Sequence, residues 1–199
     1  MKKFLGVCVV LCMSSAQAQN LVQNPNFDQD ATGWDLSMFT TWSNRVDHGD
    51  SPLSGALQIS TRDADSARQC IELRGSTAYA VSMWVEKDPQ PDIAPCATPN
   101  NHIQIELRSA AQCGGSTTLY FGSIERLPEP EGWQHFMGEI TTQDTTRSAL
   151  VTLSGSCDAK GTGISIHYFD DIFIAPDSIF ATDFEQHATE GGPSQPPGG

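Results

Sequence analysis

Short segments in which apolar and polar residues alternate constrain the fold of this chain more than any other feature. The clearest is His102–Arg108, where Ile103, Ile105 and Leu107 alternate with polar residues. A period of two is typical of a strand with one face buried. About eight or nine such segments occur with turn residues between them, and no stretch has the period of a helix. We therefore predict an all-β sandwich of two antiparallel sheets.

The strongest predicted hairpin joins Gln69–Arg74 to Tyr79–Glu86 through a turn that contains Gly75. In the second of these strands the apolar residues share one face, which leaves Trp84 and Glu86 on the other. The other expected strands are Gly55–Ser60, Leu119–Ile124, Gly132–Ile140, Arg147–Ser154 and Ile164–Ile174, with Met38–Trp42 as either a strand or a loop.

Residues 1–18 have the features of a secretory signal peptide. Two lysines open the chain, Phe4–Met13 is an apolar run, and the A-Q-A at 16–18 fits a cleavage site. The apolar run is too short to cross a bilayer as a mature helix. We predict a secreted chain, in the periplasm or the medium, with one domain at 19–176 and a tail at 177–199 that is disordered from about residue 187.

The charge of the chain limits its partners. Removing the signal leaves 181 of the 199 residues and takes away two lysines, so the net charge changes from −13 to −15. So acidic a surface argues against nucleic acid and anionic membranes as partners. It is compatible with neutral sugars, cations or basic proteins.

Four cysteines remain after the signal, namely Cys70, Cys96, Cys113 and Cys157. An even number in an oxidising compartment predicts two disulfides, and zinc is the weaker interpretation because no C-x-x-C spacing occurs. The connectivity is open. Cys96 and Cys113 flank a predicted strand whose ends lie more than ~10 Å apart, so they could pair only if a loop folded back.

The stretch Asn20–Ser37 is expected to form the first strand and turn of the sandwich. The apolar Leu21-Val22 pair would begin a strand, and the N-P-N that follows would turn the chain. Phe27 and Trp34 are predicted anchors in the core, and Trp133 is expected there too. Asp28 places a carboxylate directly after the first of these anchors.

This opening pattern, N-L-x-x-N-x-x-F-D followed by G-W, resembles the start of carbohydrate-binding modules from secreted cellulases and xylanases. These modules form the CenC-like group of the galactose-binding-like superfamily. The Y-x-x-S-x-W at 79–84 and the D-D-I of the last strand follow in the family's order. The resemblance covers Asn20 to about Ile174. It implies a jelly roll, a carbohydrate ligand and a structural calcium ion.

Asp28 and Asp170 match the positions of calcium ligands in the resembled modules. Ca²⁺ prefers a mixture of carboxylate and carbonyl oxygens, and the loop Asp47–Ser51 could add carbonyls. In the last strand Asp170 is predicted to share an inward face with Ile164, Ile166, Tyr168, Ile172 and Ile174, where an unpaired carboxylate would be costly. Asp171 is expected in solvent. The alternative is that Asp28 and Asp170 cap turns or accept backbone N–H groups without a metal.

The candidate sugar-binding surface is a row of outward side chains on two strands. Sugars present apolar C–H faces and hydroxyl edges, so a binder needs aromatic platforms beside planar amide, carboxylate or guanidinium groups. The row consists of Trp84, Glu86, His102, Gln104, Glu106 and Arg108, and Trp42, Tyr120 and Phe121 could extend it. It forms one patch only if its two strands are neighbours in one sheet. The alternative is an ordinary solvated face with Trp84 half-buried by a loop.

Catalysis has little support in the sequence. No G-x-S-x-G, H-E-x-x-H or phosphate-loop motif occurs. The adjacent Asp170 and Asp171 point to opposite faces of a strand and cannot form the carboxylate pair of a glycosidase. Ile105–Arg108 and Ile166–Tyr168 faintly resemble motifs of jelly-roll polysaccharide lyases, although their spacing departs from that family.

We therefore predict a secreted, non-catalytic protein that binds a polysaccharide through one outward sheet face. One alternative is a surface or matrix module of the same fold that binds another protein. The other is a polysaccharide lyase.

Overall fold

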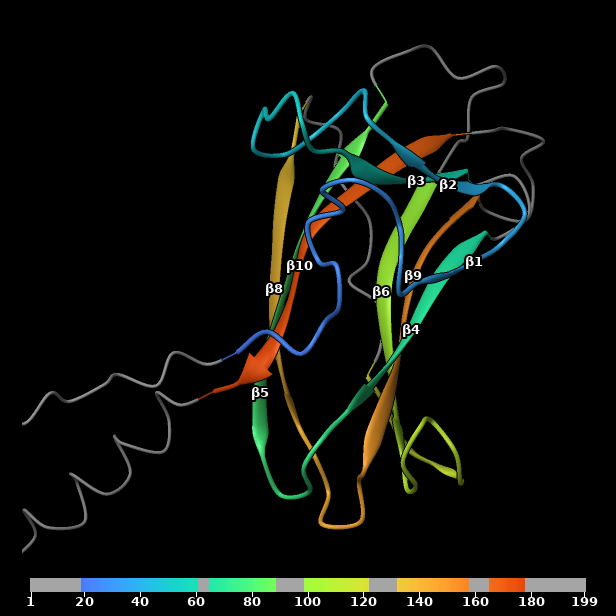
Figure 1. Ribbon diagram of the computed structural model, residues 1–199. Coiled ribbons are helices and arrows are strands. Elements are labelled where there is room, and N and C mark those ends of the chain that lie inside the picture. Colours follow the sequence, from blue (N-terminus) through green and yellow to red (C-terminus); the bar gives the residue numbers. More distant parts are fainter. Residues whose placement is uncertain (1–18, 61–64, 89–98, 122–131, 158–164, 178–199) are drawn as a thin grey trace, which may run out of the picture.

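The computed structural model describes residues 19–60, 65–88, 99–121, 132–157 and 165–177 (Figure 1). These residues form ten strands: β1 (Asp35–Leu36), β2 (Thr40–Ser43), β3 (Ala56–Ser60), β4 (Ser66–Glu72), β5 (Ala78–Lys87), β6 (Pro99–Arg108), β7 (Thr117–Phe121), β8 (Gln134–Thr141), β9 (Ser148–Cys157) and β10 (Ile166–Pro176). Within the described ranges no helix is long and apolar enough to cross a membrane. The predicted signal peptide and the tail from residue 178 lie outside the described residues.

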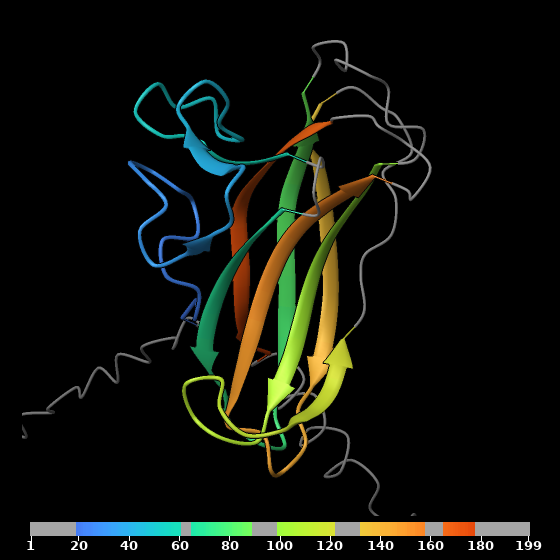
Figure 2. The ribbon, with the colours of Figure 1, turned by 90° about the vertical axis from the view of Figure 1, so that its right-hand side faces the viewer.

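The strands build two five-stranded sheets that pack face to face, as the sequence predicted. Sheet A has the order β1-β4-β9-β6-β7, sheet B has the order β2-β3-β10-β5-β8, and each pair of neighbours is antiparallel. In Figure 2 sheet A faces the viewer and sheet B lies behind it. The molecule therefore has two outer faces that point in opposite directions.

The core lies between the sheets, and alternation predicted most of it. Ile103, Ile105 and Leu107 of β6 are all fully buried, as expected. Phe27 and Trp34 also lie in the core, with ring centroids 5.6 Å apart, so both predicted anchors are confirmed. Burying a large apolar side chain contributes about 1.5–3 kcal/mol, which makes this cluster the main source of stability.

The predicted hairpin of β4 and β5 is wrong. β4 pairs with β1 and β9 in sheet A, whereas β5 pairs with β10 and β8 in sheet B. The link between them crosses from one sheet to the other, and Gly75 allows this, because a Cβ there would lie 2.3 Å from the Asp144 carbonyl oxygen. Alternation shows which face of each strand is buried. It does not show whether two buried faces lie side by side in one sheet or opposite each other across the core.

The expected first strand at Leu21-Val22 does not form. The Leu21 N–H donates to the Ile174 carbonyl (2.8 Å), but the Asn20 side chain replaces the next ladder bonds. Its Nδ2 donates to the Ile172 carbonyl (2.8 Å), and its Oδ1 accepts from the Ile174 N–H (3.0 Å). A side-chain amide thus ties the chain to β10 without a strand.

The prediction of which β10 side chains face the core holds only after a β-bulge and is wrong before it. The register shifts between Asp170 and Phe173, and Ile172 and Ile174 face the core as predicted. Before the bulge the core residue is Phe169. A one-residue shift moves side chains to the other face of the sheet, so Ile166, Tyr168 and Asp170 lie on the outer side of sheet B. Ile164 lies outside the described residues.

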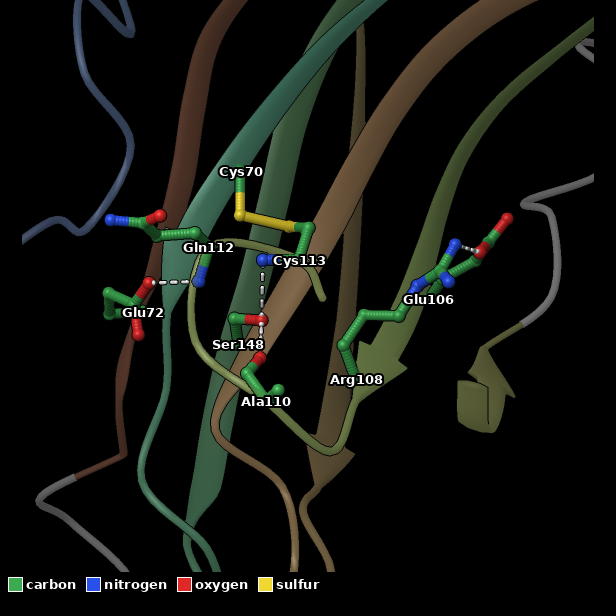
Figure 3. The surroundings of a disulfide bond; sticks show 8 residues. All are labelled: Cys70, Glu72, Glu106, Arg108, Ala110, Gln112, Cys113 and Ser148. Atoms are coloured by element: carbon green, nitrogen blue, oxygen red, sulfur yellow. Dashed lines mark hydrogen bonds and ion pairs between the residues drawn. A yellow bond between two sulfur atoms is a disulfide. The ribbon is translucent and has the colours of Figure 1, made fainter. Parts of the chain in front are cut away.

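One of the two predicted disulfides is present. Cys70 of β4 bonds to Cys113, which lies in the loop 109–116 between β6 and β7 (Figure 3). This loop crosses the outer side of β9 to reach β4 (Figure 2). Cys96 lies outside the described residues, as does the side chain of Cys157, so the second disulfide stays a prediction.

Candidate functional site

The predicted row of outward side chains is divided between the two outer faces of the molecule. Trp84 and Glu86 lie on β5 in sheet B. His102, Gln104, Glu106 and Arg108 lie on β6 in sheet A. The prediction of one continuous patch is therefore wrong. Both strands show the same alternation of apolar and polar residues, but they belong to opposite sheets.

On sheet A, Gln104, Glu106 and Arg108 line a groove that runs across three strands, whereas the side chain of His102 lies outside the described residues. It has a volume of about 290 Å³ and is lined by Ser66 and Arg68 of β4, Leu150, Thr152 and Ser154 of β9, and Gln104, Glu106 and Arg108 of β6. The strand register aligns Arg68, Thr152 and Gln104 in one row across the sheet. Residues from both halves of the chain thus meet here, and the β4 and β9 residues were not predicted.

Three planar polar groups follow one another along β6. The Gln104 Nε2 donates to Glu106 Oε1 (3.0 Å), and the Arg108 guanidinium pairs with Glu106 Oε2. The Nε of Arg108 is buried and has no hydrogen-bond partner among the described residues. Amide, carboxylate and guanidinium groups in a line can donate to and accept from successive hydroxyls of a sugar chain.

The loop 109–116 directly follows Arg108, the last β6 residue that lines the groove. Besides the disulfide, the Gln112 N–H donates to Glu72 Oε1 (2.7 Å), and the Cys113 N–H donates to Ser148 Oγ (3.0 Å). The Ser148 hydroxyl in turn donates to the Ala110 carbonyl (2.6 Å; Figure 3). The loop is therefore held to both β4 and β9.

The outer face of sheet B carries a stack of rings instead of a groove of this kind. Trp84 stacks on His48 and on His135, with centroid distances of 3.8 and 4.4 Å. Trp133, predicted in the core, is half-buried on this outer side and meets His48 edge-on at 5.6 Å. Trp42 packs against the core, and its Nε1 donates to the Phe27 carbonyl (2.7 Å). Trp84 and Trp42 are therefore engaged within the protein and are not free platforms.

Asp170 is buried although it lies on the outer side of sheet B. Only 2% of its surface is exposed, because the loop of residues 44–53 covers it. Its Oδ2 accepts from the His48 N–H (3.0 Å), and its Oδ1 accepts from the Asp171 N–H (2.8 Å). Burial raises the pKa of Asp170 to about 7 against these two hydrogen bonds, and the nearby charges of Asp171 and Asp47 raise it further. Asp171 is not simply solvated as expected, since its Oδ2 contacts His48 Nδ1 at 2.6 Å.

Asp28, the second predicted calcium ligand, is exposed, and its Oδ1 accepts from the Ser54 hydroxyl (3.2 Å). Across the described ranges no group of three or more acidic, histidine or cysteine side chains is arranged to hold a metal. A calcium ion here would thus need backbone carbonyls in addition to Asp28 and Asp170. Each carboxylate keeps lone pairs that its hydrogen bonds do not use.

The residues that faintly resembled lyase motifs do not form one site. Glu106 and Arg108 line the groove on sheet A, whereas His167 is fully buried. Tyr168 lies on the outer side of sheet B, where its hydroxyl donates to Asp88 Oδ2 (2.9 Å). Burial and this hydrogen bond raise the pKa of Tyr168 to about 12. Its hydroxyl therefore stays protonated near neutral pH and cannot accept a proton as a base.

No family model and no curated protein match the chain. Similar solved structures include the CBM22-1 xylan-binding domain of Paenibacillus barcinonensis Xyn10C, with a TM-score of 0.54, 15% identity, and coverage of 80% of this chain and 95% of that chain. The CBM22-1–GH10 modules of Clostridium thermocellum xylanase Xyn10B, complexed with xylohexaose, have a TM-score of 0.52 and 15% identity over 80% of this chain and 29% of that one.

This chain has the jelly-roll fold of such carbohydrate-binding modules. The same fold matches part of an enzyme, the enzymatically active domain of tailspike protein 4 from bacteriophage CBA120. There the TM-score is 0.56 and the identity 16%, over 79% of this chain and 21% of that chain. The chain thus spans about a fifth of the tailspike domain. At these identities the similarity shows the fold alone, and function has to be argued from the residues.

Proposed function

We propose that this protein is secreted and binds a polysaccharide, without cleaving it, in the groove on sheet A. The observation that carries the proposal is the line of Gln104, Glu106 and Arg108 on β6. Arg68 of β4 lies on the other side of β9 from this line, and β9 supplies the residues between them. The fold supports the proposal, because neighbours with this fold are named for xylan binding. The disulfide between Cys70 and Cys113 supports export to an oxidising compartment.

A glycan array with the purified mature chain tests the proposal. We expect binding to at least one plant or bacterial polysaccharide, and we expect Glu106→Ala to weaken it by about tenfold or more, equivalent to about 1.4 kcal/mol. Glu139→Ala is the matched control, because Glu139 is exposed on sheet B and outside the groove. No binding to any polysaccharide at millimolar protein would favour a protein partner instead.

The absence of catalysis has a separate test. A lyase acting on polyuronates would produce an unsaturated product that absorbs near ~230–240 nm. We expect no such absorbance, because the groove holds one carboxylate and no histidine or tyrosine among its lining residues. A rising signal that Glu106→Ala abolishes would make the protein an enzyme.

We also propose a structural calcium ion held by Asp28, Asp170 and nearby backbone carbonyls. The buried carboxylate of Asp170 supports it, because a cation would offset the cost of its ionisation. Calcium bound only to the folded state at a hundredfold excess over Kd would contribute about 2.7 kcal/mol. We expect EDTA to lower the melting temperature at pH 8 and to lower it less at pH 6, where protons compete for Asp170. An unchanged melting curve at both pH values would argue against the ion.

A further inference from the structure

A second cavity lies on the opposite face of the molecule from the groove. It has a volume of about 410 Å³, within the range of about 300–1,000 Å³ typical of small-molecule sites. Its lining comes from the loop that covers sheet B, from β5 and from the residue that precedes β8: Asn44, Arg45, Val46, Asp47, Asp50, Ser51, Pro52, Glu86 and Trp133. In Figure 1 this loop lies on the outer side of β8 and β10.

The loop wall of the cavity is held in place before any ligand arrives. His48 donates its backbone N–H to buried Asp170, contacts Asp171 through Nδ1, and stacks on Trp84. A turn closes the loop, in which the Asp50 N–H donates to the Asp47 carbonyl (3.2 Å) and the Ser51 N–H donates to Asp47 Oδ2 (2.7 Å). A pre-formed wall lowers the entropy cost of binding.

The lining combines an aromatic ring with planar polar groups, as expected of a sugar site, but it lies at a place that the sequence did not predict. Trp133 is half-buried, and because His48 meets it edge-on rather than stacked, at least one face of its indole is free of His48. Arg45 and Asn44 supply donors, and Glu86 and Asp50 supply acceptors. Burial, with the charges of Asp88 and Asp50, raises the pKa of Glu86, so a hydroxyl that donates to it would favour its ionised form.

The mixed charges of the lining select the ligand class. An anion would face the carboxylates of Asp47, Asp50 and Glu86, and among the described residues no three acidic, histidine or cysteine side chains are grouped to hold a metal cation. An uncharged ring with hydroxyl groups uses both the donors and the acceptors of the lining, and its C–H face can lie on an indole. We propose that this cavity is a second carbohydrate-binding site, for an uncharged sugar ring, so that one molecule bridges two polysaccharide chains.

The bridging follows from the position of the two sites. They open on opposite outer faces, and the sheets between them are about 10 Å apart, so one straight chain segment cannot fill both. The second site rests on the proposed function in that both sites would take a sugar. Binding at two sites joins separate chains into a network.

Titration of the ¹⁵N-labelled chain with xylohexaose, cellohexaose and β-1,4-galactotriose tests the inference site by site. The indole N–H signal of Trp133, assigned with Trp133→Phe, reports on the cavity, and the side-chain amide of Gln104 reports on the groove. We expect one of these sugars to shift both signals. In the variant with Arg68→Ala and Glu106→Ala the Trp133 shift should persist. Arg45→Ala, in an exposed loop position, should weaken it about tenfold, and Met137→Ala, exposed on the same face outside the cavity, should not change it.

The outcomes separate the two sites. Shifts at Gln104 alone would overturn the second site and leave the proposed function standing. Shifts at Trp133 alone would support the cavity and overturn the groove. If neither signal moves with any of the three sugars, the second site is overturned. Clumping of xylan-coated beads by the wild type, and its loss in Arg45→Ala at unchanged groove binding, would support bridging, whereas equal clumping by both proteins would overturn it.

Discussion

The two outer faces of the sandwich are built on the same alternation of residues, yet they differ in what covers them. On sheet A the outward residues of β4, β9 and β6 stay open and form a polar groove, and the loop that follows β6 is tied to β4 through Cys113. On sheet B a loop folds over the face, buries Asp170 and brings His48 onto Trp84. An outward position in a strand therefore predicts exposure only where no loop returns to cover it.

Removing the disulfide between Cys70 and Cys113 should destabilise sheet A and leave the face of sheet B unchanged. Replacing Cys70 and Cys113 by serine removes a cross-link between residues 43 apart in sequence, which should lower the free energy of unfolding by about 3–4 kcal/mol. Urea unfolding measures it. The groove should also lose affinity, because the loop that follows Arg108 loosens, while the cavity at Trp133 keeps its affinity. Equal free energies of unfolding for variant and wild type would show that the disulfide does not stabilise the fold.

The remaining cysteines offer a related check. With Cys113 bonded to Cys70, we expect Cys96 to pair with Cys157, which ends β9 opposite Pro99. Mass spectrometry of the non-reduced, digested chain should find the linked peptides. Free thiols on both residues in the exported protein would contradict the prediction of two disulfides.

The buried carboxylate provides a pH test of sheet B. In the folded state without calcium the pKa of Asp170 is raised to about 7 from the ordinary aspartate value of 3.8. Its contribution to stability is therefore fully present below about pH 4 and is lost as the pH rises towards 7. Urea unfolding in EDTA should show stability falling over this window by up to a few kcal/mol, and Asp170→Asn should flatten the slope. Equal slopes for the two proteins would contradict the raised pKa.

His48 tests how firmly the covering loop is held. His48→Ala removes a ring stack and a contact to Asp171, which together should cost about 1–2 kcal/mol. His135→Ala, which removes a stack on the same Trp84 from an exposed strand position, is the control and should cost less. Hydrogen exchange of residues 44–53 should rise in the first variant and not in the second. A loop whose protection is unchanged in both would show that His48 does not anchor it.

Arg68 is expected to give the smallest change in stability and a clear change in binding. It is exposed in the groove, so Arg68→Ala should alter the free energy of unfolding by no more than about 0.5 kcal/mol. Sugar affinity in the groove should fall about tenfold, measured by calorimetry with the best oligosaccharide of the array. A large loss of stability together with binding would mean that Arg68 supports the fold rather than the ligand.

The candidate sites show where prediction from the sequence stopped. Alternation correctly identified Gln104, Glu106 and Arg108 as one outward line, because side-chain direction in a strand is a local property. It could not bring in Arg68 and Thr152, which reach the groove only through the pairing of β4 with β9 and of β9 with β6. It also joined Trp84 to this line wrongly, since nothing local to β5 and β6 shows that they lie in different sheets.

The all-β class, the core anchors Phe27 and Trp34, and the buried face of most strands could all be predicted from the order of the residues. These follow from hydrophobic periodicity, which acts within a few residues. Three features became visible only in the folded chain: which strands are neighbours, where the bulge after Asp170 changes the face to which the side chains of β10 point, and which outer face a loop covers. Such features depend on contacts between residues far apart in the chain, whose free energies are settled by the packing of the whole sandwich.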